Sequence, residues 1–201
     1  MVKPYSVEKF GNDMLVRLDD GSRWRAIESV GNLYLVTAQV EEPIPPIPGG
    51  AAPFVWPFSL DLVTSEFGPR DGRLHAGIDF GNGIANVSGT DILCAGWGKV
   101  IVANTTNSHG GYGNAVVVDH GAGLHTLYGH MRFLPEGPAD VSVYEGQTVL
   151  QGQRLGGVGK TGRSFGNHLH FETHEDGYRW DASARDPREF IPKWNQILAG
   201  V

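Results

Sequence analysis

Two short histidine motifs constrain this chain more than any other feature of its sequence. The first is His168-Leu169-His170, and the second begins at His75 and ends at Asp79. Side chains alternate between the two faces of a β-strand, so residues two or four positions apart share a face. Each motif therefore presents a pair of metal-binding side chains to one side of a strand.

The residue types in these pairs are those that zinc prefers. Zinc accepts imidazole nitrogen and carboxylate oxygen, and catalytic sites use about three protein ligands and leave the fourth position to water. Either motif alone is more often a pair of packed or surface side chains than a metal site. Together, two histidines and Asp79 match the ligand count of one zinc ion, with one histidine left over.

Composition predicts a mainly β fold. The chain has 29 glycines in 201 residues, frequent valine, threonine and tyrosine, and a hydrophobic content of 40%. This composition favours short strands joined by tight turns around a hydrophobic core. We expect strands over 62–67, 78–80, 98–104, 115–120, 124–130 and 168–173, with shorter strands between 147 and 157.

A linker rich in proline and glycine, residues 41–56, divides the chain. Prolines at this density favour an extended, semi-rigid spacer. Residues 1–40 before it are predicted to form a small β-meander, with a hairpin of Asp13–Leu18 and Arg23–Ile27 and a third strand, Leu33–Val40. Because so small a sheet is marginal alone, we expect it to serve docking or tethering.

Residues 57–201 are predicted to form the main domain. Near its end, Asp186 and Pro187 are typical of a helix start, but Pro192 is incompatible with its continuation. We therefore expect one turn, a break, and a short C-terminal helix over 193–199.

Further motifs follow one another in order at Ser65–Arg70, His75–Asp79, Leu127–Met131, Gly159–Gly162 and His168–Glu172. In order and spacing they resemble the lysostaphin or LytM-type zinc endopeptidases of bacterial cell walls, over about residues 57–190. The resemblance implies a compact antiparallel β-sheet domain with a substrate groove and one Zn²⁺ ion. It also implies hydrolysis of peptide cross-links in peptidoglycan.

The resemblance also assigns roles. His75, Asp79 and His170 match the metal ligands, and His130 and His168 match the two catalytic histidines beside the metal. Zinc polarises the scissile carbonyl and lowers the pKa of a bound water. The two histidines would act as general base or acid and as oxyanion stabiliser, and the sequence does not decide which does which. No HExxH motif is present, so histidine would replace the glutamate base of other zinc proteases.

Four further residues are candidates for substrate binding or for supporting a metal ligand. Glu172 shares the strand face of His170 and could accept its second N–H, or could be a surface carboxylate. Asn114 could orient substrate or a ligand, or could be a turn residue. Tyr112 could line the groove or pack in a core or rim. Some relatives carry a tyrosine in the loop before the first ligand. Residues 67–74 contain none, and Arg70 or Arg73 is a weak substitute.

Charge and hydropathy patterns limit the partners. The formal net charge is −6, which argues against nucleic-acid binding. The sequence shows neither a signal peptide nor an apolar run of about 18 residues, so we expect no membrane insertion. For an enzyme acting on the bacterial cell wall, the alternatives are an unrecognised secretion route or a leader that was removed. The hypothesis that we retain is a bacteriophage protein, mounted on the virion tail or released at lysis. Residues 1–40 would then bind other phage tail proteins.

Three functional classes follow from the sequence. The first is a zinc endopeptidase that hydrolyses peptide cross-links of peptidoglycan. The second is a catalytically silent structural or wall-binding module on the same fold, which the retained histidines argue against. The third is a zinc carboxypeptidase or amidase of wall peptides. The D-Ala-D-Ala carboxypeptidases separate their first histidine and aspartate more widely than His75 and Asp79, which argues against this class. Glycine bridges and direct cross-links both stay open as the bond cleaved.

Overall fold

The computed structural model describes residues 5–10, 13–18, 23–29, 32–39, 54–58, 62–70, 72–81, 87–179 and 181–191. The chain divides into two compact units, Met1–Pro43 and Ile44–Val201. Residues 41–53 of the predicted linker and the predicted helix over 193–199 lie outside the described residues.

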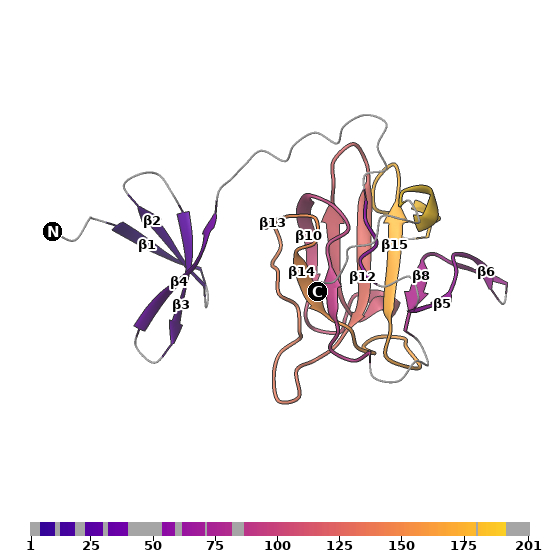
Figure 1. Cartoon of the computed structure of the whole chain (residues 1–201), viewed down its shortest axis with the longest axis horizontal. Helices are drawn as coiled ribbons and strands as arrows, with labels where there is room; N and C mark the ends of the chain where they lie inside the picture. Colours follow the sequence, from indigo (N-terminus) through magenta and orange to yellow (C-terminus); the bar gives the residue numbers. More distant parts are fainter. Residues whose placement is uncertain are drawn as a thin grey trace. The chain divides into compact units, whose positions relative to one another are not determined.

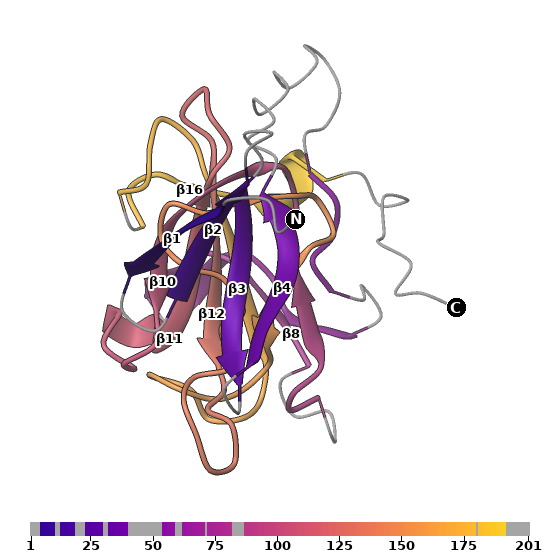
Figure 2. The ribbon, with the colours of Figure 1, turned by 90° about the vertical axis from the view of Figure 1, so that its left-hand side faces the viewer.

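The first unit is a four-stranded antiparallel meander. Its strands β1 (Tyr5–Phe10), β2 (Asp13–Leu18), β3 (Arg23–Ser29) and β4 (Asn32–Gln39) pair in chain order, as Figure 2 shows. The pairing of β2 with β3 confirms the predicted hairpin. The sequence prediction omitted β1, whose Lys9 and Glu8 interrupt the apolar pattern that marks the other strands.

The second unit is built on one antiparallel sheet with the strand order β13-β10-β11-β12-β15-β8-β5, and β16 pairs with β15 (Figure 1). Two small pairs, β14 with β9 and β6 with β7, complete it. The strands are β5 (Val63–Ser65), β6 (Gly68–Arg70), β7 (Arg73–His75), β8 (Ile78–Phe80), β9 (Asp91–Leu93), β10 (Gly98–Asn104), β11 (Asn114–Asp119), β12 (His125–Met131), β13 (Thr148–Val149), β14 (Arg154–Gly157), β15 (Leu169–His174) and β16 (Ala184–Arg185).

The two faces of the central strands carry different chemistry. Tyr128 of β12 and Phe171 of β15 lie on the core face, where their ring centroids are 5.3 Å apart. His170 and Glu172 of β15 alternate with Phe171 and lie on the other face. Strand β15 is buried throughout, so its polar face must be covered and hydrogen-bonded.

Helical structure among the described residues consists of short 3₁₀ turns, which fits the predicted mainly β class. Two of these turns are η2 (Gly110–Tyr112) and η3 (Pro187–Glu189), and in η3 the Asp186 side chain accepts a hydrogen bond from the Arg188 N–H. The single turn predicted at Asp186 is confirmed. No helix of the described part of the chain is long and apolar enough to cross a membrane.

A buried histidine stabilises the end of β11. His120 is 3% exposed; its Nδ1–H donates to the carbonyl of Trp97 at 2.6 Å, and its Nε2 lies 2.7 Å from the Thr126 hydroxyl. Burial lowers the pKa of His120 to about 4, because the charged imidazolium would be desolvated. The side chain is therefore neutral in the folded protein near pH 7.

We predict that His120 makes the protein less stable in mild acid. Between pH 6.5 and about 4 the unfolded chain takes up a proton at this site that the folded protein does not. The free energy of unfolding therefore decreases as the pH is lowered. Between pH 7.5 and 5 this loss amounts to about 2 kcal/mol. Urea unfolding at both pH values should show a smaller acid loss in His120→Asn than in the wild type. Equal losses in the two proteins would contradict the prediction.

Candidate metal centre and active site

A pocket of about 480 Å³ opens on the polar face of the central strands. Most of the residues singled out from the sequence line it, together with residues of the segment 161–168. The lining consists of Arg70, His75, Asp79, Gly111, Tyr112, His130, Arg163, Ser164, Phe165, His168 and His170.

The pairing register of two strands brings the predicted metal ligands together. Asp79 of β8 lies directly opposite His170 of β15, and His75 ends β7 just before the turn into β8. Gly77 lies in that turn, where a Cβ atom would come within 2.3 Å of the Phe171 carbonyl oxygen. The glycine between the ligands therefore allows the turn to pack directly on β15.

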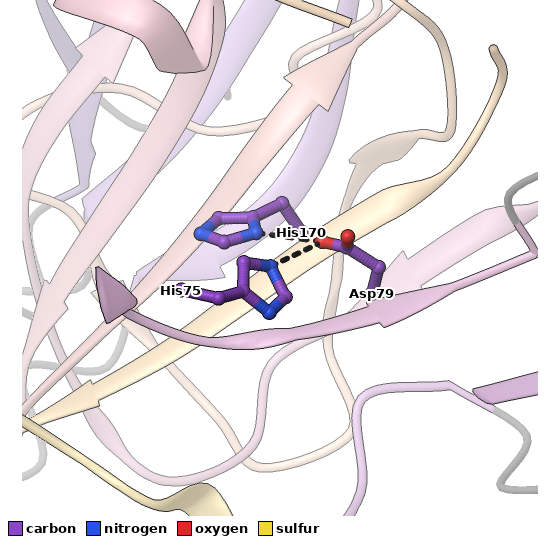
Figure 3. Close-up of side chains that lie close together, drawn as sticks. All are labelled: His75, Asp79 and His170. Atoms are coloured by element: carbon purple, nitrogen blue, oxygen red, sulfur yellow. Dashed lines mark hydrogen bonds and ion pairs between the residues drawn. The ribbon is translucent and has the colours of Figure 1, made fainter. Parts of the chain in front are cut away.

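The imidazole rings of His75 and His170 converge on one carboxylate oxygen of Asp79 (Figure 3). Asp79 Oδ1 lies 3.1 Å from His75 Nε2 and 2.7 Å from His170 Nδ1. One donor atom from each residue lies within 4.8 Å of the others, and all three side chains are buried. Two imidazole nitrogens and one carboxylate oxygen are a donor set that fits zinc and leaves a coordination position for water.

Hydrogen bonds outside this group fix how each ligand presents itself. His75 Nδ1–H donates to the Glu66 carbonyl at 2.7 Å, and His170 Nε2–H donates to the Glu172 carboxylate at 2.8 Å. A histidine that donates from one nitrogen offers the lone pair of the other to a metal. The arrangement therefore directs His75 Nε2 and His170 Nδ1 to the same point.

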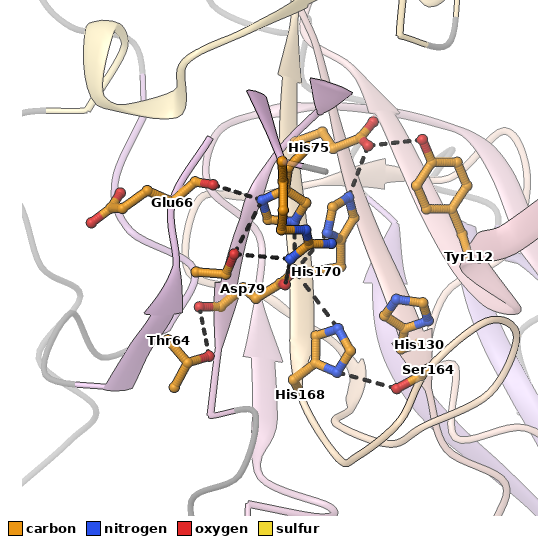
Figure 4. A network of polar contacts seen from close by, with 12 residues as sticks. Thr64, Glu66, His75, Asp79, Tyr112, His130, Ser164, His168 and His170 are labelled. Atoms are coloured by element: carbon orange, nitrogen blue, oxygen red, sulfur yellow. Dashed lines mark hydrogen bonds and ion pairs between the residues drawn. The ribbon is translucent and has the colours of Figure 1, made fainter. Parts of the chain in front are cut away.

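A buried polar network connects His170 and Tyr112 (Figure 4), and Glu172 is its centre. It is 0% exposed and accepts hydrogen bonds from His170, from His174 Nε2 at 2.8 Å and from the Tyr112 hydroxyl at 2.8 Å. Burial raises its pKa, but the hydrogen bonds from His170 and His174 outweigh burial and lower the pKa to about 2. Glu172 is thus an ionised interior group, and the alternative of a surface carboxylate is wrong.

Hydrogen bonds from histidines also keep Asp79 ionised. Burial raises the pKa of Asp79, but hydrogen bonds from His170 and His75 outweigh burial and leave the pKa well below its usual range. The pKa of His170 is lowered by burial and raised more strongly by Asp79 and Glu172, to about 9. A cation at the convergence point would replace the proton that His170 holds there.

His168 and His130 lie beside the three ligands. His168 precedes β15, and its Nε2 is 3.6 Å from Asp79 Oδ1; the centroids of the His130 and His168 rings are 4.5 Å apart. His168 Nδ1–H donates to the Gly166 carbonyl at 2.9 Å, and His130 Nδ1–H donates to the Thr161 carbonyl at 2.8 Å. Burial lowers the pKa of both imidazoles, so both are neutral near pH 7 with a lone pair on Nε2.

A β-bulge turns His130 toward the pocket. Strict alternation from Tyr128 would send His130 to the core face. Instead Tyr128 pairs with Val116 and Met131 pairs with Asn114, so two residues of β12 lie opposite one residue of β11. His130 takes a left-handed φ of 61°, which places both it and Gly129 on the polar face.

Asn114 lies under the bulge rather than in the pocket. Its side chain is fully buried, Nδ2–H donates to the Met131 carbonyl at 3.3 Å, and Oδ1 accepts from the Asn107 N–H at 2.8 Å. The Thr161 hydroxyl donates to the same Met131 carbonyl at 2.7 Å and accepts from the Asn114 N–H at 2.9 Å. Asn114 and Thr161 together clamp the strand at the position where it departs from regular pairing.

Tyr112 and Arg70 reach the pocket from separate segments. The ring of Tyr112, from η2, stacks on His170 with centroids 5.6 Å apart. Arg70 of β6 donates to the Ser65 hydroxyl at 3.0 Å and lies 3.6 Å from Asp79 Oδ2. Sequence reasoning did not identify Thr161, Ser164 or the carbonyl of Glu66, because a backbone carbonyl or a threonine in a loop carries no pattern of its own.

Comparison with known proteins agrees with this site. The model of peptidase family M23 matches residues 73–182, more than half of the chain. The chain is 35% identical over 127 residues to the DD-carboxypeptidase/endopeptidase Mpg of Neisseria meningitidis serogroup B, a match covering 60% of this chain and 26% of that protein. It is 37% identical over 119 residues to the peptidoglycan DD-endopeptidase ShyA of Vibrio cholerae, covering 55% of this chain and 24% of that protein.

A solved structure shows the same fold. The catalytic domain of the antimicrobial peptidase lysostaphin from Staphylococcus simulans superposes with a TM-score of 0.53 at 28% identity. The match covers 64% of this chain and 90% of that domain. The chain spans only about a quarter of the length of the curated relatives it matches, so their similarity concerns one part of those proteins.

We predict that Glu172→Gln weakens metal binding. The amide has nearly the shape of the carboxylate but lacks the charge that holds His170, and loss of such a partner typically costs 10- to 100-fold in affinity. Zinc competition against a chromophoric chelator would measure the loss, with circular dichroism as a check on folding. Glu175→Gln removes an exposed carboxylate from the segment that follows the same strand and serves as the matched control. Unchanged zinc affinity in Glu172→Gln would contradict the role of this residue.

Proposed function

Because this chain belongs to peptidase family M23, we propose that it hydrolyses peptide cross-links of bacterial peptidoglycan as a zinc-dependent endopeptidase. One observation carries the proposal: a buried His-Asp-His group shares its pocket with two further histidines, each with a lone pair on Nε2. The name of the peptidoglycan DD-endopeptidase ShyA supports peptidoglycan as the substrate class.

The metal would be held by His75 Nε2, His170 Nδ1 and the carboxylate of Asp79. Zinc bound there would polarise the scissile carbonyl and lower the pKa of a water molecule toward neutrality. The carbonyl of Glu66 and the carboxylate of Glu172 keep the two imidazoles in the orientation that this requires.

His168 and His130 supply the proton transfers. In its neutral form each can take a proton at Nε2 from the attacking water and return it to the leaving amine. To donate a hydrogen bond to the oxygen that becomes negative in the transition state, the other imidazole would take up a proton from solvent at Nε2, because its neutral form has only a lone pair there. The rings of His130 and His168 lie close enough to act on one substrate carbonyl. We assign the general base and the oxyanion donor to these two residues.

We predict that histidine substitutions separate metal loss from loss of proton transfer. His170→Ala should release zinc and abolish cleavage of purified peptidoglycan sacculi. His168→Ala and His130→Ala should retain zinc and slow cleavage by about 10²- to 10⁴-fold. His125→Asn changes a histidine of β12 outside the pocket and serves as the control. Zinc content by atomic absorption and muropeptide release by chromatography are the measurements.

The products distinguish the functional classes. An endopeptidase converts cross-linked dimers into monomers, whereas a carboxypeptidase shortens stem peptides and leaves the dimers intact. A protein that binds zinc but releases no muropeptide would favour the silent structural or wall-binding module. Equal digestion by the wild type and His170→Ala would exclude this metal centre as the catalyst.

We also propose that residues 1–40 tether the enzyme to a bacteriophage tail, where it opens the wall during infection. The support is the separate compactness of the N-terminal unit, a four-stranded meander too small to be a second enzyme. We expect mass spectrometry of purified particles to find peptides of this chain at tail stoichiometry. Detection only in the lysate, and never in particles, would instead favour a free lysin.

A further inference from the structure

The charge of the pocket is opposite to that of the chain. The whole chain carries a formal net charge of −6, yet Arg70 and Arg163 both line the pocket. Among the described residues, Asp79 brings the only carboxylate to the lining, and it belongs to the metal-ligand group. A metal cation would leave the pocket more positive still. The local field therefore favours a substrate that carries negative charge.

Arg163 is fixed at its backbone and exposed at its side chain. Its N–H donates to the Gly111 carbonyl at 2.7 Å, and the N–H of the preceding Gly162 donates to Asn107 Oδ1 at 2.6 Å. The guanidinium has no carboxylate partner within ion-pair distance among the described residues. An anchored, unpaired guanidinium at a pocket rim is well suited to bind a carboxylate from a ligand.

Phe165 supplies an apolar surface next to this charge. Its relative exposure is 106%, the highest among the exposed large hydrophobic side chains, although it is also part of the pocket lining. A ring this exposed gains free energy when a ligand covers it. Arg163 and Phe165 lie in one segment and present a charged and an apolar group to the same ligand.

We propose that Arg163 and Phe165, with Arg70, form a carboxylate-binding subsite that selects cross-links with a free carboxylate beside the scissile bond. The inference rests on the proposed endopeptidase function and names its substrate class. Direct cross-links between stem peptides that contain dicarboxylic amino acids carry such a group. Bridges made only of glycine do not, and they offer nothing for Phe165 to cover.

The subsite also adjoins the groups that orient the histidines. The carbonyls of Thr161 and Gly166 accept hydrogen bonds from His130 and His168, and Arg163 and Phe165 lie between these two carbonyls in sequence. Arg163, His130 and His168 also line the same pocket, so a substrate carboxylate on Arg163 would bind in the pocket that holds both histidines.

A pair of synthetic cross-linked peptides tests the proposal. One carries the free carboxylate, and the other carries a carboxamide at the same position, which removes the charge and keeps the shape. With zinc-loaded full-length protein we expect kcat/KM to favour the carboxylate peptide by about tenfold, as one charge-assisted hydrogen bond typically provides. Arg163→Gln should lose this preference through a higher KM, and Arg163→Lys should keep part of it. Added salt should weaken the preference.

Lys99→Gln is the matched control, because it removes one positive charge from an exposed side chain of β10, outside the pocket. It should retain the wild-type preference. Equal cleavage of both peptides by the wild type, or an unchanged preference in Arg163→Gln, would overturn the subsite and leave the endopeptidase function standing. Faster cleavage of an oligoglycine peptide would also overturn it. Failure of the zinc-loaded wild type to cut any cross-linked peptide would overturn the proposed function itself.

Discussion

The hydrogen bonds from His75 and His170 to the carboxylate of Asp79 are the interaction on which the rest of the structure depends. A carboxylate that is 3% exposed is costly unless it is paired, and here two imidazoles pair it. The pairing requires β8 beside β15 in one register, because a shift of one residue would turn Asp79 to the opposite face. The close approach at Gly77 accompanies this pairing of β8 with β15.

Regular strand geometry places His170 on the polar face of the sheet, whereas a β-bulge places His130 there. His168, His170, Glu172 and His174 follow one another on a single face, so alternation alone aligns them. His130 reaches that face only through the bulge and a positive φ, a conformation that non-glycine residues seldom adopt. The clamp of Asn114 and Thr161 on the Met131 carbonyl gives the hydrogen bonds that hold this departure in place.

These two cases explain how far sequence reasoning reached. Alternation predicted the shared face of His168 and His170, and composition predicted the β class. Alternation was wrong for His75 and Asp79, because His75 ends β7 and Gly77 lies in the turn that leads to Asp79 in β8. The same rule would have sent His130 to the core, so its place came from family resemblance rather than from a pattern. Asn114 was expected near the metal or in a turn, but it lies buried under the bulge. Its role depends on long-range pairing with Met131, which no local sequence signal encodes.

The sheet and the loop 161–168 contribute differently to the pocket. The ligands stand on strands, and their positions do not depend on the loop. His130 and His168, in contrast, take their orientation from the carbonyls of Thr161 and Gly166 in that loop. Exchange of side chains such as Arg163 or Phe165 can therefore alter what the pocket selects without displacing the metal group. A change to the loop backbone, in contrast, would alter the orientation of His130 and His168.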